Sequence, residues 1–198
     1  MIDYISDKVL DYLVKKDTIP NDEDELAHYK YGIEITISSF LNIILVTLLG
    51  VVLSKINLSV IFLILFISIR QLTGGYHANS YFKCNITMCV SYSVCILITM
   101  ILKNHFTMFW AVAHIILSSL IIILFCPVSN KNKPIKTESR NKYKIASLII
   151  SDFFSALGYV IYNVNKEVGL FIITTIILIN ALVIISKFSE RRKGHETE

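Results

Sequence analysis

The chain has 198 residues and a formal net charge of +4; 54% of its residues are hydrophobic and only 17% are charged. Soluble domains average about 45–50% apolar and about 25% charged residues, and here the charges cluster and leave long uncharged tracts. The composition therefore excludes an ordinary soluble domain. It predicts an all-α, polytopic integral membrane protein whose main solvent is the bilayer.

The N-terminal residues 1–16 (MIDYISDKVLDYLVKK) alternate apolar and charged side chains with helical periodicity, which predicts an amphipathic helix. Such a helix lies on the membrane surface, receives a partner helix or packs on the protein's own cytoplasmic face. Residues 17–25 form an acidic linker that contains Pro20. We assign residues 1–32 to a cytoplasmic N-terminal region, and the charged, acidic start predicts no cleavable signal peptide.

Six apolar segments follow, and each is long enough to predict a helix that crosses a hydrocarbon core of about 30 Å. They occupy residues 33–53, 56–72, 86–102, 108–126, 145–162 and 168–186. The fifth is the weakest, because it contains Asp152. Short connections alternate with two longer polar ones, at 73–85 and 127–144, which favours three helical hairpins. We expect about six transmembrane helices within a domain of residues 33–186.

Lys and Arg residues indicate the orientation of these helices. With six crossings, 16 of the 19 lie on the side that holds the N-terminal region, the two longer connections and the C-terminal tail 187–198. The other side holds Lys55, Lys103 and Lys166. The positive-inside rule therefore predicts that both termini and both longer connections are cytoplasmic.

The most unusual stretch is residues 70–84, RQLTGGYHANSYFKC. His77 and Cys84 are seven residues apart, which in one continuous helix corresponds to about 10 Å along the axis. That separation is too large for a hydrogen bond between imidazole and thiol. A reactive pair therefore requires a break in the helix, and Gly74 and Gly75 permit one.

Cys84 lies at the predicted start of the third apolar segment, where the N–H groups of a helix stabilise a thiolate. Lys83 adds a nearby cation. His77 would take the thiol proton and later return it to a leaving amine, as in a cysteine protease. The alternative interpretation is an incidental interfacial histidine and a buried cysteine. The four cysteines match no metal-ligand spacing, so we expect no metal and no cofactor.

Several of these residues carry a resemblance to a known family. Arg70, Gly75, His77 and Cys84 resemble the motif of the AgrB family of accessory gene regulator peptidases. The later stretch KNKPIK, at residues 131–136, resembles the family's second basic loop. The likeness covers nearly the whole chain, including its length, the N-terminal helix and both loops.

The resemblance implies a cysteine endopeptidase of a bacterial cell membrane that processes an AgrD-like quorum-sensing propeptide. It implies that His77 is the base and that Cys84 attacks the bond before the propeptide's C-terminal tail, forming a thioester. An internal Cys or Ser of the peptide then closes a thiolactone or lactone ring. The implied partners are the propeptide, the lipid bilayer and a second copy of the chain, with no nucleic acid.

Other polar residues have more than one interpretation. Arg70 and Gly75 are supporting or substrate-binding candidates, and the loop cations bind either an acidic propeptide tail or anionic lipid; these are Lys131, Lys133 and Lys136. Glu34 and Asp152 are candidates for a third catalytic residue, because ionisable groups within membrane segments are often functional. The alternative function is a small peptide transporter or export channel, which would tolerate Cys84→Ala.

Overall fold

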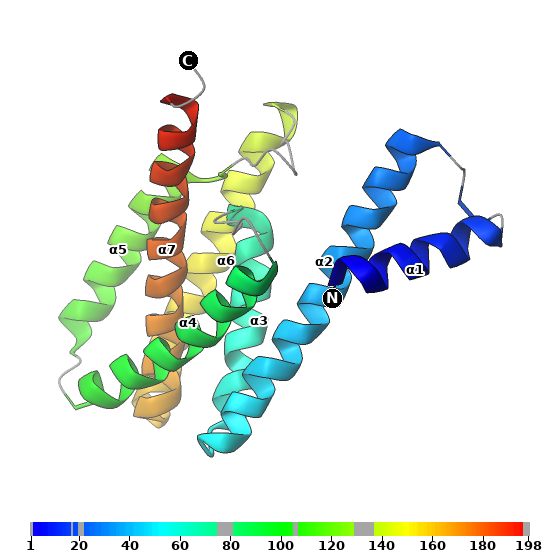
Figure 1. Cartoon of the computed structure of the whole chain (residues 1–198). Coiled ribbons are helices and arrows are strands. Elements are labelled where there is room, and N and C mark those ends of the chain that lie inside the picture. Colours follow the sequence, from blue (N-terminus) through cyan, green and yellow to red (C-terminus); the bar gives the residue numbers. More distant parts are fainter. Residues whose placement is uncertain are drawn as a thin grey trace.

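A computed structural model describes residues 2–16, 18–19, 22–74, 81–104, 107–128 and 137–195 (Figure 1). Within these ranges the chain forms helices joined by connections, and the predicted all-α fold is confirmed. The helices are α1 (Ile2–Lys15), α2 (Glu23–Val52), α3 (Ile56–Thr73), α4 (Tyr81–Leu102), α5 (Met108–Phe125), α6 (Thr137–Val164) and α7 (Lys166–His195). The amphipathic N-terminal segment is α1, and each of the six predicted apolar segments falls in one helix from α2 to α7.

Five of these helices are long and apolar enough to cross a membrane, as judged over the described residues. They are α2 from Glu25 to Val52, α3, α4, α6 from Glu138 to Val164 and α7 from Lys166 to Phe188. The protein is therefore a polytopic membrane protein. Helix α5 contains a shorter apolar stretch, Val112–Phe125. Its full crossing, which would complete the six predicted spans, stays a prediction.

Several helices extend beyond the apolar segments that predicted them. Helix α2 begins at Glu23, ten residues before its predicted apolar segment, and α6 begins at Thr137, eight residues before. Helix α7 continues through the basic tail to His195. Adding residues to an existing helix is easier than starting one, so the polar flanks continue the helices. The expected acidic linker and second long connection are correspondingly shorter than predicted.

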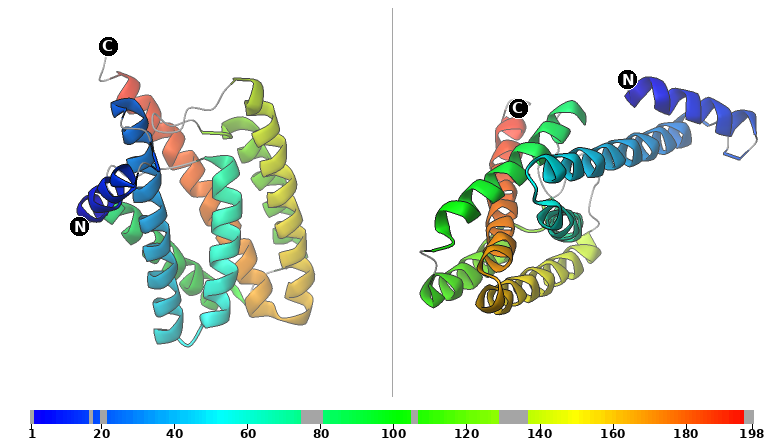
Figure 2. Two further views of the ribbon diagram at one scale, coloured as in Figure 1. Left: turned by 90° about the vertical axis from the view of Figure 1, so that its right-hand side faces the viewer. Right: turned by 90° about the horizontal axis from the view of Figure 1, so that it is seen from below.

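Helix α7 is the centre of the bundle and packs against α3, α4, α5 and α6. The views in Figures 1 and 2 agree that α1 and α2 form a hairpin that projects from one side. The main core cluster joins α3, α4 and α7, and its large aromatic members are Phe62, Phe66, Tyr92 and Phe171. A smaller cluster of Ile122, Cys126, Val128 and Val183 joins the end of α5 to α7.

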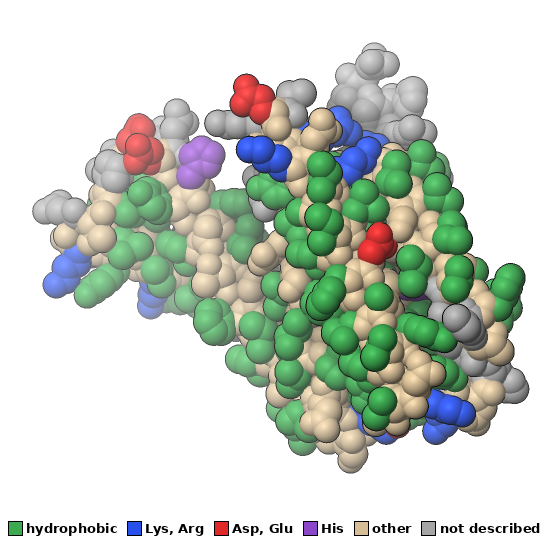
Figure 3. All heavy atoms as spheres, turned by 180° about the vertical axis from the view of Figure 1, so that it is seen from behind, with side chains coloured by type: hydrophobic (Ala, Val, Ile, Leu, Met, Phe, Trp, Pro, Cys, Tyr) green, Lys and Arg blue, Asp and Glu red, His purple; other side chains and the backbone are tan. Residues whose placement is uncertain are grey.

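The two ends of the bundle differ in their connections. At one end, here named the turn end, short connections follow α2 (residues 53–55), α4 (103–107) and α6 (Asn165). At the other, named the loop end, longer connections join Thr73 to Tyr81 and Phe125 to Thr137. Figure 3 shows that Lys and Arg side chains gather toward the two ends of the bundle, with a mainly hydrophobic surface between them.

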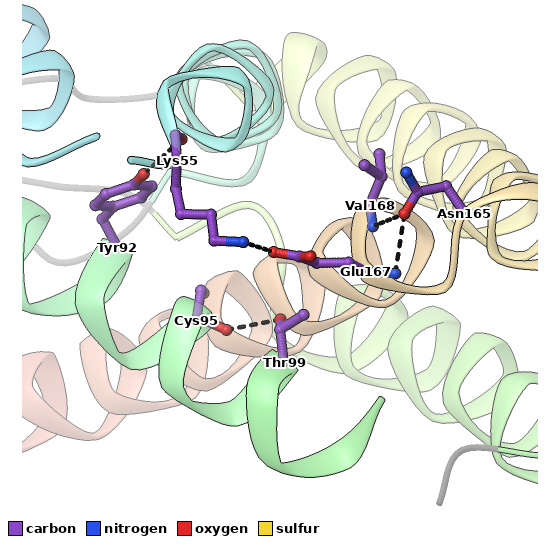
Figure 4. A network of polar contacts seen from close by, with 7 residues as sticks. All are labelled: Lys55, Tyr92, Cys95, Thr99, Asn165, Glu167 and Val168. Carbon is purple, nitrogen blue, oxygen red and sulfur yellow. Dashed lines mark hydrogen bonds and ion pairs between the residues drawn. The ribbon is translucent and has the colours of Figure 1, made fainter. Parts of the chain in front are cut away.

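A network of hydrogen bonds and an ion pair joins the helices at the turn end (Figure 4). Lys55, between α2 and α3, forms an ion pair with Glu167 in the first turn of α7. The Tyr92 hydroxyl of α4 donates a hydrogen bond to the Lys55 carbonyl oxygen at 3.1 Å. The Asn165 side-chain oxygen accepts the N–H groups of Glu167 and Val168, both at 3.1 Å, and so caps α7. These contacts hold α2, α3, α4 and the α6–α7 hairpin together.

Candidate functional site

The residues between Arg70 and Cys84 do not form one helix. Helix α3 ends at Thr73, Gly74 has a φ of +69°, and α4 begins at Tyr81. A positive φ is strained for residues with a side chain and easy for glycine, so Gly74 ends α3. The predicted break is confirmed. Gly75 and His77 lie outside the described residues, and the contact of His77 with Cys84 stays a prediction.

Gly74 also joins the two long connections of the loop end. It forms an isolated parallel bridge with Val128, and the Val128 N–H donates to the Thr73 carbonyl oxygen at 2.9 Å. A Cβ atom at Gly74 would lie 2.2 Å from the Val128 carbonyl oxygen, so the approach requires glycine. The His77 loop and the basic loop therefore leave the bundle from adjacent residues.

Cys84 is the fourth residue of α4 and is a half-buried free thiol. It lies in the first turn of the helix, near the N–H groups that have no partner within the helix. Arg70, in the last turn of α3, lies close enough for its charge to interact with Cys84, and its guanidinium carbon is 5.1 Å from the centre of the Phe66 ring. The Arg70 guanidinium is thus within electrostatic range of Cys84, and the Lys83 side chain is exposed.

Hydrogen bonds to α2 flank Cys84 on both sides in the sequence. The Tyr81 hydroxyl donates to Glu34 Oε2 at 2.7 Å, and the Ser38 hydroxyl donates to Asn85 Oδ1 at 3.1 Å. Of the two acidic candidates from the sequence, Glu34 is therefore the one joined to the Cys84 helix. Sequence reasoning missed Tyr81 and Asn85. The available signal was a pair of polar residues, Glu34 and Ser38, one turn apart at the start of an apolar segment.

Asp152 lies away from this region. Its Oδ1 accepts a hydrogen bond from the Ser119 hydroxyl of α5 at 2.9 Å. It is also 15 residues into α6, which corresponds to about 22 Å along the helix axis from the loop end. It thus adjoins buried polar contacts between α5, α6 and α7, in which Ser118 bonds Ser151 at 3.1 Å and Asn180 at 2.8 Å. Such contacts hold membrane helices together.

The basic residues of the second loop, Lys131, Lys133 and Lys136, lie outside the described residues. Their contacts with a propeptide tail or with lipid therefore stay predictions. Within the described ranges, no group of three or more His, Cys, Asp or Glu side chains is arranged to hold a metal ion.

These features define a class: a helical, multi-pass membrane protein with a half-buried thiol, a guanidinium and a carboxylate gathered where two loops leave the bundle. A sequence profile of the family described as Accessory gene regulator B matches residues 6–189. The chain therefore belongs to the AgrB family, a bacterial family that takes part in the processing of AgrD-type quorum-sensing propeptides.

Individual relatives agree with this membership. An AgrB-like protein of Clostridium beijerinckii is 28% identical over 80% of this chain and 78% of its own length. The AgrB-like protein 2 of Clostridium perfringens is also 28% identical, over 82% of this chain and 79% of its own length. Protein FsrB of Enterococcus faecalis is 24% identical over 71% of this chain and 60% of its own length. No solved structure matches the chain.

Proposed function

We propose that this protein is a membrane cysteine endopeptidase that removes the C-terminal tail of an AgrD-like propeptide and promotes cyclisation of the remainder. The observation that carries the proposal is the position of Cys84, a half-buried free thiol in the first turn of α4 and within electrostatic range of Arg70. The family membership supplies the substrate class. A free thiol in the middle of an apolar helix, such as Cys95, has no comparable surroundings.

The reaction has two acyl-transfer steps. In the first, His77 takes the Cys84 proton, the sulfur attacks the carbonyl carbon before the tail, and the C–N bond breaks. The proton passes from His77 to the leaving amine, and the N-terminal part of the propeptide remains on Cys84 as a thioester. In the second step, an internal Cys or Ser side chain attacks the thioester carbonyl. This closes a thiolactone or lactone ring and restores the Cys84 thiol.

The charges of the loop end support this sequence of steps. The positive charge of Arg70 is within electrostatic range of Cys84, at the end of the bundle where we expect the propeptide to bind. The bridge between Gly74 and Val128 brings together the residues from which the His77 loop and the basic loop depart. We infer that Lys131, Lys133 and Lys136 bind the acidic tail while the neighbouring loop holds the scissile bond. Gly75 adds a second flexible residue next to the nucleophile loop.

The proposal also fixes an orientation and an assembly. Both termini and the loop end face the cytoplasm, as the distribution of Lys and Arg predicts, and the working unit is a homodimer in the bilayer. A membrane-impermeant maleimide applied to intact cells tests the orientation. Cys84, as the single remaining cysteine, should react only after the cells are opened. Reaction in intact cells would exclude a cytoplasmic site.

The covalent intermediate provides the central test. A propeptide whose ring-forming Cys or Ser is replaced by Ala should accumulate as an adduct on this protein, and hydroxylamine should release it. Mass spectrometry of a digest should place the acyl group on Cys84. The matched control is Cys89→Ala, which removes another half-buried thiol of α4 and should leave the adduct unchanged. An adduct at another residue, or normal cleavage by Cys84→Ala, would contradict the proposal.

The alternative function, a peptide transporter or export channel, has one observation in its favour. Polar side chains from α5, α6 and α7 meet deep in the bundle, as Ser118, Ser151 and Asn180 do, and transport pathways are lined in this way. A transporter tolerates Cys84→Ala and loses export of a labelled peptide on substitution of Asn180. A peptidase, in contrast, loses cleavage when Cys84 is replaced by Ala.

A further inference from the structure

We propose that Glu34 is a positioning residue, which holds the Cys84-bearing first turn of α4 in place and connects it to the N-terminal helix α1. This inference rests on the proposed peptidase function. Its basis is one carboxyl group with two partners: Tyr81 of α4 donates to Glu34 Oε2 at 2.7 Å, and Ser6 of α1 lies 3.2 Å from Oε1. The single Ser6 hydroxyl proton is shared with the Asp3 carbonyl oxygen at 2.8 Å.

Glu34 is buried, so the loss of a hydrogen bond to its carboxyl group is unfavourable. Its exposed fraction is 9%, and that of Ser6 is 0%. A buried carboxyl group is unfavourable unless its oxygens are hydrogen-bonded. Both oxygens of Glu34 are used, one for each neighbouring helix. Movement of either helix therefore removes one of the two hydroxyl groups that contact the Glu34 carboxyl group.

A second hydrogen bond adds to the attachment of α4 to α2. Glu34 and Ser38 lie one turn apart on α2, and their partners Tyr81 and Asn85 lie one turn apart on α4. Two parallel hydrogen bonds resist both rotation and sliding of a helix, whereas one resists mainly separation. Cys84 lies between the two attachment points in the sequence, so a shift of either one moves the backbone that carries the thiol.

Helix α1 contacts the Glu34 carboxyl group through the Ser6 hydroxyl. The neighbouring α1–α2 contact is an ion pair between Asp7 and Lys30 at 2.5 Å, with both side chains more than one third exposed, and such surface pairs contribute little. Tyr4 and Tyr12 of α1 are also largely exposed. A partner segment that shifts α1 would remove the Ser6 donor, and Glu34 would transmit that change to α4.

The expected consequence is a change in rate rather than in substrate binding. A nucleophile displaced by about 1 Å loses about 10²-fold in rate, while the loop contacts of the propeptide are unaffected. Tyr81→Phe removes a single hydroxyl and should lower kcat about tenfold or more, with KM nearly unchanged. Ser6→Ala should act in the same direction with a smaller effect. The two losses should not add, because both act through Glu34.

The experiment uses the full chain in lipid nanodiscs and measures two rates. The first is single-turnover cleavage of a synthetic AgrD-like propeptide with an amphipathic helix, a central Cys and an acidic tail. The second is alkylation of Cys84 by iodoacetamide in a chain whose other three cysteines are Ala. The matched control is Tyr92→Phe, which removes a hydroxyl from the same helix at the turn end, where it bonds Ser59 and Lys55.

The proposal expects Tyr81→Phe to change both rates and Tyr92→Phe to change neither. Wild-type rates in Tyr81→Phe, or an equal loss in Tyr92→Phe, would overturn it. Wild-type alkylation in Ser6→Ala would overturn the connection to α1. If the unmodified chain cleaves nothing while Tyr81→Phe still alters alkylation, the peptidase function fails and the positioning of Cys84 by Glu34 stands.

Discussion

The turn end and the loop end of the bundle both carry polar networks, but the networks have different surroundings. At the turn end, Lys55, Tyr92, Asn165 and Glu167 bond one another or the adjacent backbone across short connections. At the loop end, Glu34, Arg70 and Cys84 lie beside two longer connections that leave from adjacent residues.

Polar side chains alone therefore do not identify a functional site in a membrane bundle. An ion pair that joins two tight turns limits helix movement. A half-buried thiol in the first turn of a helix lies next to a longer connection in the chain. The comparison predicts that substitutions at the loop end alter catalysis, and that substitutions at the turn end alter stability.

The largest effect is expected from Cys84→Ala. Removal of a covalent nucleophile lowers the rate of cleavage at least about 10³-fold, since such losses reach about 10⁶-fold in other proteases. The half-buried position of Cys84 predicts little change in folding. Propeptide cleavage in nanodiscs and the thermal unfolding midpoint measure the two quantities. Residual cleavage above a few per cent would show that another residue performs the attack.

The second prediction concerns the bridge between the loops. Gly74→Ala places a Cβ atom 2.2 Å from the Val128 carbonyl oxygen and forces a side chain into a φ of +69°. We expect the loops to separate and the cleavage rate to fall about 10²-fold, as for a displaced catalytic group. The strain should also lower the free energy of unfolding by about 1–3 kcal/mol.

Gly32→Ala is the matched control for this substitution. A Cβ atom at Gly32 has no neighbour within 4 Å, and alanine is favoured over glycine within a helix by about 1 kcal/mol. The control should retain full activity with equal or higher stability. Loss of activity in Gly32→Ala, or full activity in Gly74→Ala, would show that cleavage does not depend on the bridge between Gly74 and Val128.

The sequence was sufficient to predict the helices and the break between them. Each apolar segment is too long and too poor in charge for any other structure in a bilayer. The glycine pair at 74–75 marks the end of α3, because Gly74 adopts a conformation that other residues avoid. The resemblance to a family made Arg70 a supporting or substrate-binding candidate, and its proximity to Cys84 came only from the structure.

The contacts between helices were not predictable in the same way. Glu34 and Tyr81 are 47 residues apart, and Gly74 meets Val128 across two intervening helices. A helix that is apolar on all sides does not show in its sequence which face meets which neighbour. Asp152 illustrates the limit, because its carboxyl oxygen accepts a hydrogen bond from Ser119 of α5, a contact that the sequence does not indicate.

A third prediction, with a smaller effect, tests the charge of the loop end. Replacing Lys131, Lys133 and Lys136 together by Gln should raise KM for an acidic-tailed propeptide about tenfold, while kcat stays near wild type. Added salt should produce the same rise in the unmodified protein, because salt screens interactions between exposed charges. A propeptide with a neutral tail is the control and should respond to neither change. Equal KM values for both propeptides would assign the loop cations to lipid.

The smallest effect on catalysis is expected at the turn end, from Glu167→Gln. The substitution removes the charge that pairs with Lys55 and retains the shape of the side chain. Because both side chains are about one third exposed, the free energy of unfolding should fall by about 1 kcal/mol or less. The cleavage rate at 25 °C should be unchanged, since the pair lies at the opposite end from Cys84.

Lys55→Met combined with Glu167→Leu should recover stability, because neither charge remains unpaired. Thermal unfolding and single-turnover cleavage on the same samples check both statements. A tenfold loss of cleavage in Glu167→Gln at full folding would mean that the two ends are coupled through α7, which contacts both clusters of the core, and the division between a structural and a catalytic end would have to be abandoned.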